Sequence, residues 1–350
     1  MKHNLKIQPR YVAKSGVLAL LFFLMALFLA SLYFRSTKIA PTVAVPETSA
    51  DQHPKLDFDA YDKKLYEIAG SPSSTPPALW PVKTVYPKAG AILPFNRIVA
   101  YYGNLYSKGM GVLGEYPEHQ MLDMLQAEAK KWETADPATP VVPALHYIAV
   151  VAQAGPRADG KYRARMPDKE IDKVLKMAEK IQGIVFLDIQ AGLSNLQIEL
   201  PRLEKYLKLP HVHLGVDPEF AMKNGAAPGT AIGSLDATDI NFAANYLAEI
   251  VRKNNLPPKI IVVHRFTQKM LTNYRNVNPL PEAQIVINMD GFGGQPNKIN
   301  TYKQFISKEP VQFTGFKLFY KNDLRRPGST LLLPADLLKL VPIPVYIQYQ

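Results

Sequence analysis

The sequence predicts an α/β protein whose main domain is a (β/α)8 TIM-type barrel, preceded by an N-terminal transmembrane helix and a Pro-rich linker. From Asn96 onward, short apolar runs alternate with segments of helical pattern, which is typical of βα units on a parallel sheet. Eight such runs occupy about 255 residues, close to the usual barrel length of about 250. Polar residues follow several runs, where the active sites of such barrels lie. An open, doubly wound sheet is the alternative.

The segment from Ser15 to Phe34 carries no charge over 20 residues, the length that crosses a bilayer as a helix. Basic residues are concentrated before it, so the positive-inside rule places residues 1–14 in the cytoplasm and the barrel outside the cell membrane. A cleaved signal peptide is the alternative. The apolar run is long for a signal peptide and no small-x-small site closes it, which favours a single-pass anchor at 15–34.

Composition narrows the function classes. Six basic residues and no acidic residue lie in positions 1–38, and these account for +6 of the net charge of +11. The remaining +5 is spread over a long chain without a basic stripe between aromatic residues, so no nucleic-acid partner is expected. The chain contains no cysteine, which excludes disulfides and a lipid-anchored cysteine.

Residues 35–94 form the predicted linker. It begins as a polar, proline-containing spacer, and 71–94 is a Pro-rich lead-in to the barrel domain at 95–350. Between them, apolar residues near helical spacing predict one short helix at 56–69. The chain stops at its eighth strand, so we expect this helix to fill the gap that a missing eighth helix leaves in the outer ring.

The predicted strands cover 98–102, 141–150, 184–189, 211–220, 260–266, 285–290, 314–320 and 345–349. Helices are predicted at 120–132, 196–207, 268–274, 299–306 and 335–340. Two more are expected to begin at the capping residues Asp168 and Asp236. Within 196–207, Pro201 is unfavourable in a helix interior. The long loop 221–235 is a candidate lid.

The run His211 to Phe220 is the most informative strand. Val212, Leu214 and Val216 alternate with His213, Gly215 and Asp217, and side chains two residues apart share one face of a strand. The aliphatic face therefore packs toward the helices. The polar face points into the barrel and leads to Asp217 and Glu219 at the carboxyl end, which is where catalytic residues of this fold lie.

Four carboxylates end such strands and are the candidate catalytic residues: Glu219, Asp290, Asp217 and Asp188. Burying unpaired charge costs several kcal/mol, so four acids converging on one opening indicate a functional pocket, with structural polar networks as the alternative. Further polar and aromatic residues on the strands are candidate substrate-binding residues: Tyr101, Tyr102, His146, His264, Lys317, Tyr320, Tyr346 and Gln348.

The first functional hypothesis is glycoside hydrolysis of a cell-envelope or environmental carbohydrate. It requires one protonated carboxyl and one ionised carboxyl. Glu219 is the expected acid, with its pKa raised by neighbouring acids, and Asp290 is the expected partner. Tyrosines would supply flat faces for a sugar. The seventh strand ends in Lys317 and Tyr320 without an acid, unlike the common retaining barrel glycosidases.

Three alternatives remain open. His146, His213 and His264 with the four acids provide ligands for a metal-dependent hydrolase or phosphodiesterase, although the first strand lacks an HxH pair. Lys317 suits Schiff-base chemistry. A non-catalytic glycan-binding protein would need the same aromatic residues. No organic cofactor is expected, and a divalent metal is the one inorganic cofactor considered. The GFGG at 291–294 suits a tight turn or a phosphate site.

Four segments carry a resemblance to a known family: LDIQAG (187–192), VHLGVDPEF (212–220), VINMDGFGG (286–294) and PVQFTGFKLFY (310–320). In these, the sequence resembles a family of bacterial exported or membrane-anchored barrel proteins described as glycosidase-like. The resemblance covers roughly Arg97 to Gln350. It implies the barrel fold and an extracytoplasmic location, and it implies no particular catalytic residues.

Overall fold

The structure of the protein, a computed structural model, describes residues 55–70, 80 and 85–350. The predicted cytoplasmic tail (1–14), the predicted anchor (15–34) and most of the linker before residue 85 lie outside the described residues. Within the described ranges, no helix has both the length and the apolar character needed to span a bilayer.

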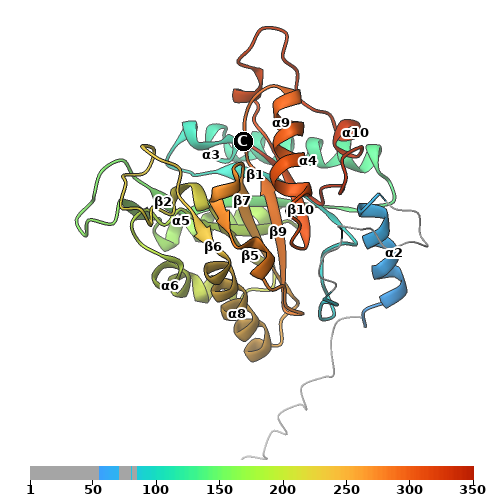
Figure 1. Ribbon diagram of the computed structural model, residues 1–350, viewed down its shortest axis with the longest axis horizontal. Helices are drawn as coiled ribbons and strands as arrows, with labels where there is room; N and C mark the ends of the chain where they lie inside the picture. The colour runs from blue at the N-terminus through green and yellow to red at the C-terminus, as the bar shows by residue number, and fades with distance from the viewer. Residues whose placement is uncertain (1–54, 71–79, 81–84) are drawn as a thin grey trace, which may run out of the picture. The chain divides into compact units, whose positions relative to one another are not determined.

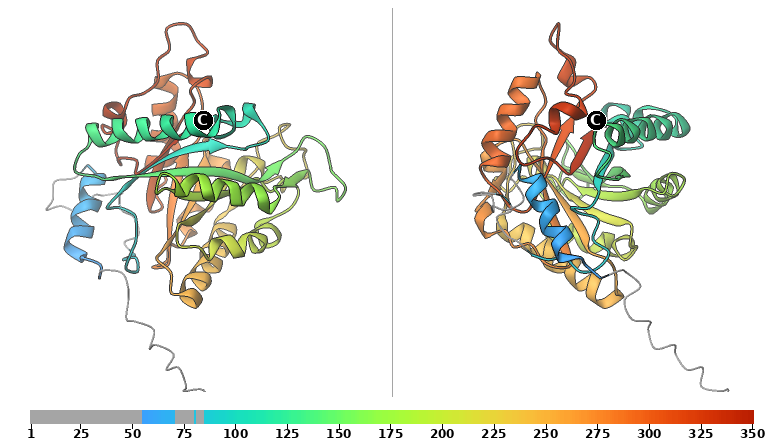
Figure 2. Two further views of the ribbon diagram at one scale, coloured as in Figure 1. Left: turned by 180° about the vertical axis from the view of Figure 1, so that it is seen from behind. Right: turned by 90° about the vertical axis from the view of Figure 1, so that its right-hand side faces the viewer.

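Eight parallel strands form a closed barrel surrounded by helices (Figures 1 and 2). The first strand pairs with both the last and the second strand, which closes the sheet and excludes the open doubly wound alternative. The predicted closed barrel is therefore confirmed. Its strands are β1 (Arg97–Gly103), β2 (Val141–Ala152), β4 (Ile184–Ile189), β5 (Val212–Val216), β7 (Lys259–Arg265), β9 (Ala283–Met289), β10 (Phe313–Leu318) and β11 (Tyr346–Tyr349).

Strand alternation separates two environments. Along β5, Val212, Leu214 and Val216 belong to the buried layer between the barrel and its helices, as the sequence predicts. The other face of β5 points into the barrel, where the ring of His213 lies 5.2 Å from that of Phe186 on β4. Every residue of these two strands is buried, because one face packs on helices and the other fills the barrel interior.

The helices of the outer layer follow the predicted order, with shifted ends. They are α4 (Glu118–Ala135), α5 (Asp168–Glu179), α6 (Leu196–Glu199), α7 (Glu204–Leu207), α8 (Ala237–Asn254), α9 (Gln295–Thr301) and α10 (Pro334–Leu337). The predicted cap at Asp236 is confirmed, since its side chain accepts a hydrogen bond from the backbone N–H of Thr238 at the start of α8. The predicted cap at Asp168 is wrong: Pro167 precedes α5, and Asp168 is the first helical residue.

Three predicted helices are irregular. A 3-10 segment, η2 (Leu200–Leu203), interrupts 196–207 at Pro201, which cannot donate a helical hydrogen bond. Segment 268–274 is not a helix; it contains the 3-10 turn η4 (Gln268–Met270) and strand β8 (Leu271–Thr272), which pairs with β6 (Leu235–Asp236). Helix α9 continues into the π-helical η6 (Tyr302–Ser307).

Several shorter elements lie between the strands and helices of the barrel. Strand β3 (Arg163–Arg165) pairs antiparallel with the end of β2. The 3-10 turn η1 (Lys108–Met110) and the short helix α3 (Val112–Glu115) follow β1. Further 3-10 turns are η3 (Pro218–Phe220), η5 (Tyr274–Asn276) and η7 (Asn322–Leu324). Because η1, η3 and η7 follow barrel strands, they lie at the carboxyl end of the barrel.

Helix α2 (Phe58–Ile68) closes the amino end of the barrel instead of completing the outer ring (Figure 1). Its buried residues Tyr61 and Leu65 belong to one hydrophobic cluster with residues from the amino-terminal ends of the barrel strands, such as Ile98 and Phe313. The prediction that this helix fills the outer ring is therefore wrong, because its apolar face fits the open bottom of the barrel.

The outer face of the last strand, β11, is covered by α4. Helix α10 contacts α4 directly. Trp132 of α4 is fully buried, and its indole N–H donates a 3.0 Å hydrogen bond to the Tyr349 hydroxyl on the outer face of β11. The long α4 and its tryptophan thus cover the outer face of the last strand.

Candidate active site

A cavity of about 530 Å³ opens at the carboxyl end of the barrel. Five of the predicted site residues line it: Tyr102, Asp217, Glu219, Asp290 and Lys317. They come from β1, the β5–η3 junction, the end of β9 and β10, and their side chains meet because the carboxyl ends of parallel strands share one rim. Four phenylalanines also line the cavity: Phe220, Phe266, Phe292 and Phe319.

Asp290 is held between two basic groups. Its Oδ1 lies 2.9 Å from Lys317 Nζ, and its Oδ2 lies 2.9 Å from His264 Nδ1. Burial alone would raise the pKa of Asp290, but the positive charges of Lys317 and His264 outweigh it and lower this pKa to about 2. Asp290 is therefore a carboxylate at neutral pH.

Unlike Asp290, Asp217 makes no ion pair within the described part of the chain. Its Oδ2 accepts a 3.2 Å hydrogen bond from the Gln190 amide, and its Oδ1 accepts one from the backbone N–H of Glu219 at 3.1 Å. Burial and the neighbouring carboxylates raise the pKa of Asp217 to about 8. This side chain therefore keeps its proton at neutral pH and helps to reduce the negative charge of the cavity floor.

Glu219 lies at the end of the same turn and is less buried than Asp217. Within the described residues its carboxyl makes no ion pair and no hydrogen bond to a side chain. Burial, followed by repulsion from Asp290, raises the pKa of Glu219 to about 7. Below about pH 7, Glu219 therefore keeps its proton while Asp290 in the same cavity is ionised, which is the arrangement that acid–base chemistry requires.

Lys317 is fixed on two sides. Besides its contact with Asp290, its Nζ lies 3.8 Å from the centre of the Tyr102 ring. The Asp290 carboxylate and the Tyr102 ring therefore occupy the surroundings of Nζ, and this geometry does not favour Schiff-base chemistry at Lys317.

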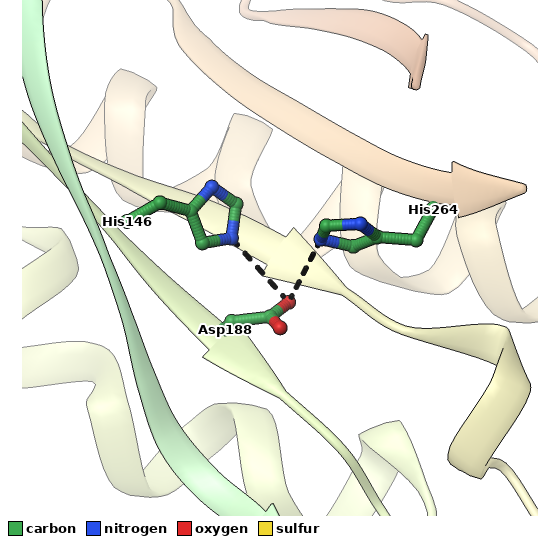
Figure 3. Close-up of side chains that lie close together, drawn as sticks. All are labelled: His146, Asp188 and His264. Atoms are coloured by element: carbon green, nitrogen blue, oxygen red, sulfur yellow. Dashed lines mark ion pairs between the residues drawn. The ribbon is translucent and has the colours of Figure 1, made fainter. Parts of the chain in front are cut away.

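Three predicted residues lie beneath the cavity and do not line it: His146 on β2, Asp188 on β4 and His264 on β7 (Figure 3). Asp188 Oδ1 lies 3.6 Å from His146 Nε2 and 3.8 Å from His264 Nε2. Burial would raise the pKa of Asp188, but His264 and His146 lower it, while burial lowers the pKa of His146 to about 4. In the described part of the chain these are the residues grouped closely enough to hold a metal ion.

Tyr346 and Gln348 lie on β11. The Tyr346 hydroxyl lies 2.6 Å from His146 Nδ1 and accepts a 2.9 Å hydrogen bond from the Gln348 amide. Both residues are fully buried, and neither lines the cavity. The structure therefore places them as supports of the histidine and not in contact with a ligand in the cavity.

Tyr101 and Tyr320 face away from the cavity. Their hydroxyls lie 3.0 Å apart, and both rings pack against Tyr349 in the layer between barrel and helices. The reason is strand alternation, because Tyr101 shares the outward face of β1 with Val99 while Tyr102 points inward. We therefore assign these two tyrosines to the outer layer and exclude them from the candidate site.

His213 also lies apart from the histidines of the metal-sized group. Its Nδ1 accepts a 3.2 Å hydrogen bond from the backbone N–H of Ile260, near the amino ends of the strands. Burial, and then the charge of Lys259, lowers the pKa of His213 far below its usual value. This histidine is a neutral residue of the barrel interior.

Sequence analysis missed Gln190 and the phenylalanines of the cavity. Gln190 stands two residues after Asp188, and Phe319 stands two after Lys317, so both follow the inward face of strands that were correctly predicted. Continuing the inward-facing series of each strand by two more residues would have identified Gln190 and Phe319. Phe292 comes from the GFGG turn, and 59% of its side chain is exposed at the rim.

These features define a closed (β/α)8 barrel with a polar cavity at the carboxyl ends of its strands, lined by acids of opposed protonation state. No family model matches the chain, and no curated protein sequence matches it. Among solved structures it is similar to a ruminal GH26 endo-β-1,4-mannanase, with 11% sequence identity and a TM-score of 0.33. The match covers 72% of this chain and 58% of the mannanase chain.

Proposed function

We propose that this protein is a glycoside hydrolase, with Glu219 as the general acid and Asp290 as the ionised partner. The observation that carries the proposal is the contrast between the two carboxyls in one cavity. Asp290 is held between Lys317 and His264, whereas Glu219 makes no ion pair with any residue that the structure describes. Cleavage of a glycosidic bond uses this division, because one carboxyl protonates the leaving oxygen while the other attacks the sugar or activates water.

The lining of the cavity suits a sugar. Phe266, Phe292 and Phe319 provide flat apolar faces, and the rings of Phe292 and Phe319 lie 6.0 Å apart at the rim. Beside them, Gln190, Asn322 and Gln350 offer amide groups for hydrogen bonds to hydroxyls. A binding site that combines apolar faces with a few placed polar groups fits a neutral, polyhydroxylated ligand.

The proposed substrate is a glycan of the cell envelope or of the surroundings. This part of the proposal rests on the uncharged stretch 15–34 and the basic residues before it, which favour a single-pass membrane protein with its barrel outside the cytoplasm. A barrel held there would meet such polymers directly.

A hydrolysis screen tests the proposal. The full chain, purified in detergent, is incubated with a panel of glycans and aryl glycosides alongside Glu219→Gln and Asp290→Asn. We expect each variant to lower kcat by about 100-fold or more, since each removes one partner in acid–base catalysis. Glu249→Gln, an exposed residue of α8 paired with Lys253, is the matched control and should keep full activity.

Two results would contradict the proposal. Turnover that survives in both variants would show that these carboxyls have other roles. If the wild-type chain bound a glycan without hydrolysing it, the protein would instead be a glycan receptor. A receptor needs the phenylalanines of the cavity but does not need one protonated and one ionised carboxyl.

A further inference from the structure

His146, Asp188 and His264 come from three different strands and point to one place inside the barrel (Figure 3). All three side chains are fully buried. Their facing atoms, His146 Nε2, Asp188 Oδ1 and His264 Nε2, lie within 4.8 Å of one another. None of the three lines the cavity, so the proposed hydrolysis does not use this point directly.

The spacing of the facing atoms is too wide for hydrogen bonds. Asp188 Oδ1 lies 3.6 Å from His146 Nε2 and 3.8 Å from His264 Nε2, beyond the usual limit of about 3.2 Å for N–H···O. All three facing atoms are buried, and none has a hydrogen-bond partner among the residues that the structure describes. Ligands bound about 2.0–2.1 Å from a tetrahedral metal stand about 3.4 Å apart, which is close to the observed separations.

Each of the three side chains is already oriented through its other polar atom. His146 Nδ1 lies 2.6 Å from the Tyr346 hydroxyl, and His264 Nδ1 lies 2.9 Å from Asp290 Oδ2. The Tyr102 hydroxyl donates a 3.1 Å hydrogen bond to Asp188 Oδ2. Such outer partners, including a carboxylate behind a histidine, are what fix the ligands of protein-bound metals.

A glycine, Gly215, lies beside the facing atoms of His146 and Asp188. Gly215 on β5 faces the same point, and a Cβ there would lie 2.3 Å from His146 Nε2 and 2.5 Å from Asp188 Oδ1. Any side chain at this position would therefore collide with the facing atoms. With no side chain there, Gly215 lets β5 lie close to the unpaired nitrogen and oxygen atoms without a collision.

We propose that His146, Asp188 and His264 bind one divalent transition-metal ion of the zinc class inside the barrel. Two imidazoles and one carboxylate are a donor set that suits zinc, cobalt(II) or iron(II). The ion would tie β2, β4 and β7 together. It would also hold His264 as a neutral imidazole whose Nδ1–H donates to Asp290, so it would position the proposed catalytic carboxylate without touching the substrate.

The competing arrangement needs no metal. In it, His264 is an imidazolium shared by Asp290 and Asp188, and His146 is neutral. Burial lowers the pKa of His264, but the charges of Asp290 and Asp188 outweigh this and raise it. Metal content and spectroscopy separate the two arrangements, because a proton leaves neither signal.

The test uses the full chain purified in detergent. After dialysis against a chelator and then against Zn²⁺ or Co²⁺, we expect about one metal ion per chain by elemental analysis. With Co²⁺ we expect visible d–d absorption, and the thermal midpoint should rise on loading and fall again with chelator. Asp188→Asn and His264→Gln should each weaken metal affinity by at least about tenfold. His119→Gln, an exposed histidine of α4, is the matched control and should bind as wild type does.

Wild-type protein that retains no stoichiometric metal, gives no d–d absorption and shows no thermal shift would overturn the proposal. These three readings need no variant, so a variant that fails to fold does not obscure the answer. Metal bound equally well by Asp188→Asn and His264→Gln would also overturn it. Glu219→Gln should keep the metal while losing hydrolysis, so this proposal and the proposed hydrolysis can fail separately.

Discussion

Lys317 Nζ lies 2.9 Å from Asp290 Oδ1, although the two residues stand on different strands of the barrel. The side chains of both are almost completely buried, at 3% and 6% exposure. Because His264 approaches the other oxygen of Asp290, one carboxylate joins groups from β7, β9 and β10. This contact decides both the charge of Asp290 and the position of the lysine over Tyr102.

Breaking this pair should destabilise the fold. Lys317→Met leaves a buried carboxylate with His264 as its remaining basic partner, and loss of one member of a buried pair costs about 3–5 kcal/mol. Urea unfolding of Lys317→Met, Asp290→Asn and the double variant measures the coupling. We expect the double variant to be more stable than the sum of the single losses predicts. Additive losses would show that the two charges do not support each other.

The rate of glycan hydrolysis should depend on the proton of Glu219. Because burial, together with repulsion from Asp290, raises its pKa to about 7, the acid form is available below that pH and is lost above it. We expect kcat/KM to fall about tenfold per pH unit above pH 7. A rate that stays constant from pH 6 to pH 9 would exclude Glu219 as the acid.

Asp217 should make stability fall as the pH rises. Burial, and then nearby carboxylates, raise its folded-state pKa to about 8, so between pH 5 and pH 8 the native chain keeps a proton that the unfolded chain has lost. Raising the pH therefore favours unfolding. Asp217→Asn removes this titration, and its stability relative to wild type should increase by about 4 kcal/mol from pH 5 to pH 9. An equal difference at the two pH values would contradict the assignment.

Gly215 should not tolerate a methyl group. Gly215→Ala places a Cβ against His146 and Asp188, and such overpacking typically costs about 1–3 kcal/mol. Gly155→Ala is the matched control, because no atom lies within 4 Å of its added Cβ. Thermal unfolding of the two variants should separate them clearly. Equal midpoints would show that the barrel centre can relax around the new group.

The two neighbouring tyrosines of β1 should behave differently. Replacing Tyr101 and Tyr320 together by phenylalanine removes both partners of one hydrogen bond, so we expect about 1 kcal/mol of lost stability and unchanged hydrolysis. Tyr102→Phe leaves Asp188 Oδ2 without its donor and should lower both stability and hydrolysis. If the double variant lost more activity than Tyr102→Phe, the outward placement of Tyr101 would be wrong.

Local patterns determined much of the fold. Short apolar runs separated by helical segments identified the barrel strands, and period-2 alternation identified the inward face of β5, because the helix-facing side of that strand is apolar and its barrel-facing side is not. The place of Asp217, Glu219, Asp290 and Lys317 at one rim followed from the rule that parallel strands end together.

The same patterns failed where two readings were locally equivalent. Tyr101 and Tyr102 are adjacent aromatic residues, and the pairing of β1 with β2 and β11 decides which of them points inward. The amphipathic pattern of α2 showed that one face of the helix is buried, but it did not show which part of the protein covers that face. The position of α2 at the amino end of the barrel was therefore not predictable from the spacing of its apolar residues.

The sequence by itself determined a parallel barrel, the strands that compose it and the acids at its carboxyl end, since these depend on residues close together in the chain. Tertiary structure decided which acids keep a proton, which are paired with cations, and that His146, Asp188 and His264 meet beneath the cavity. The physical reason is that charge and metal-sized spacing depend on distances between side chains from different strands, and only closure of the sheet sets those distances.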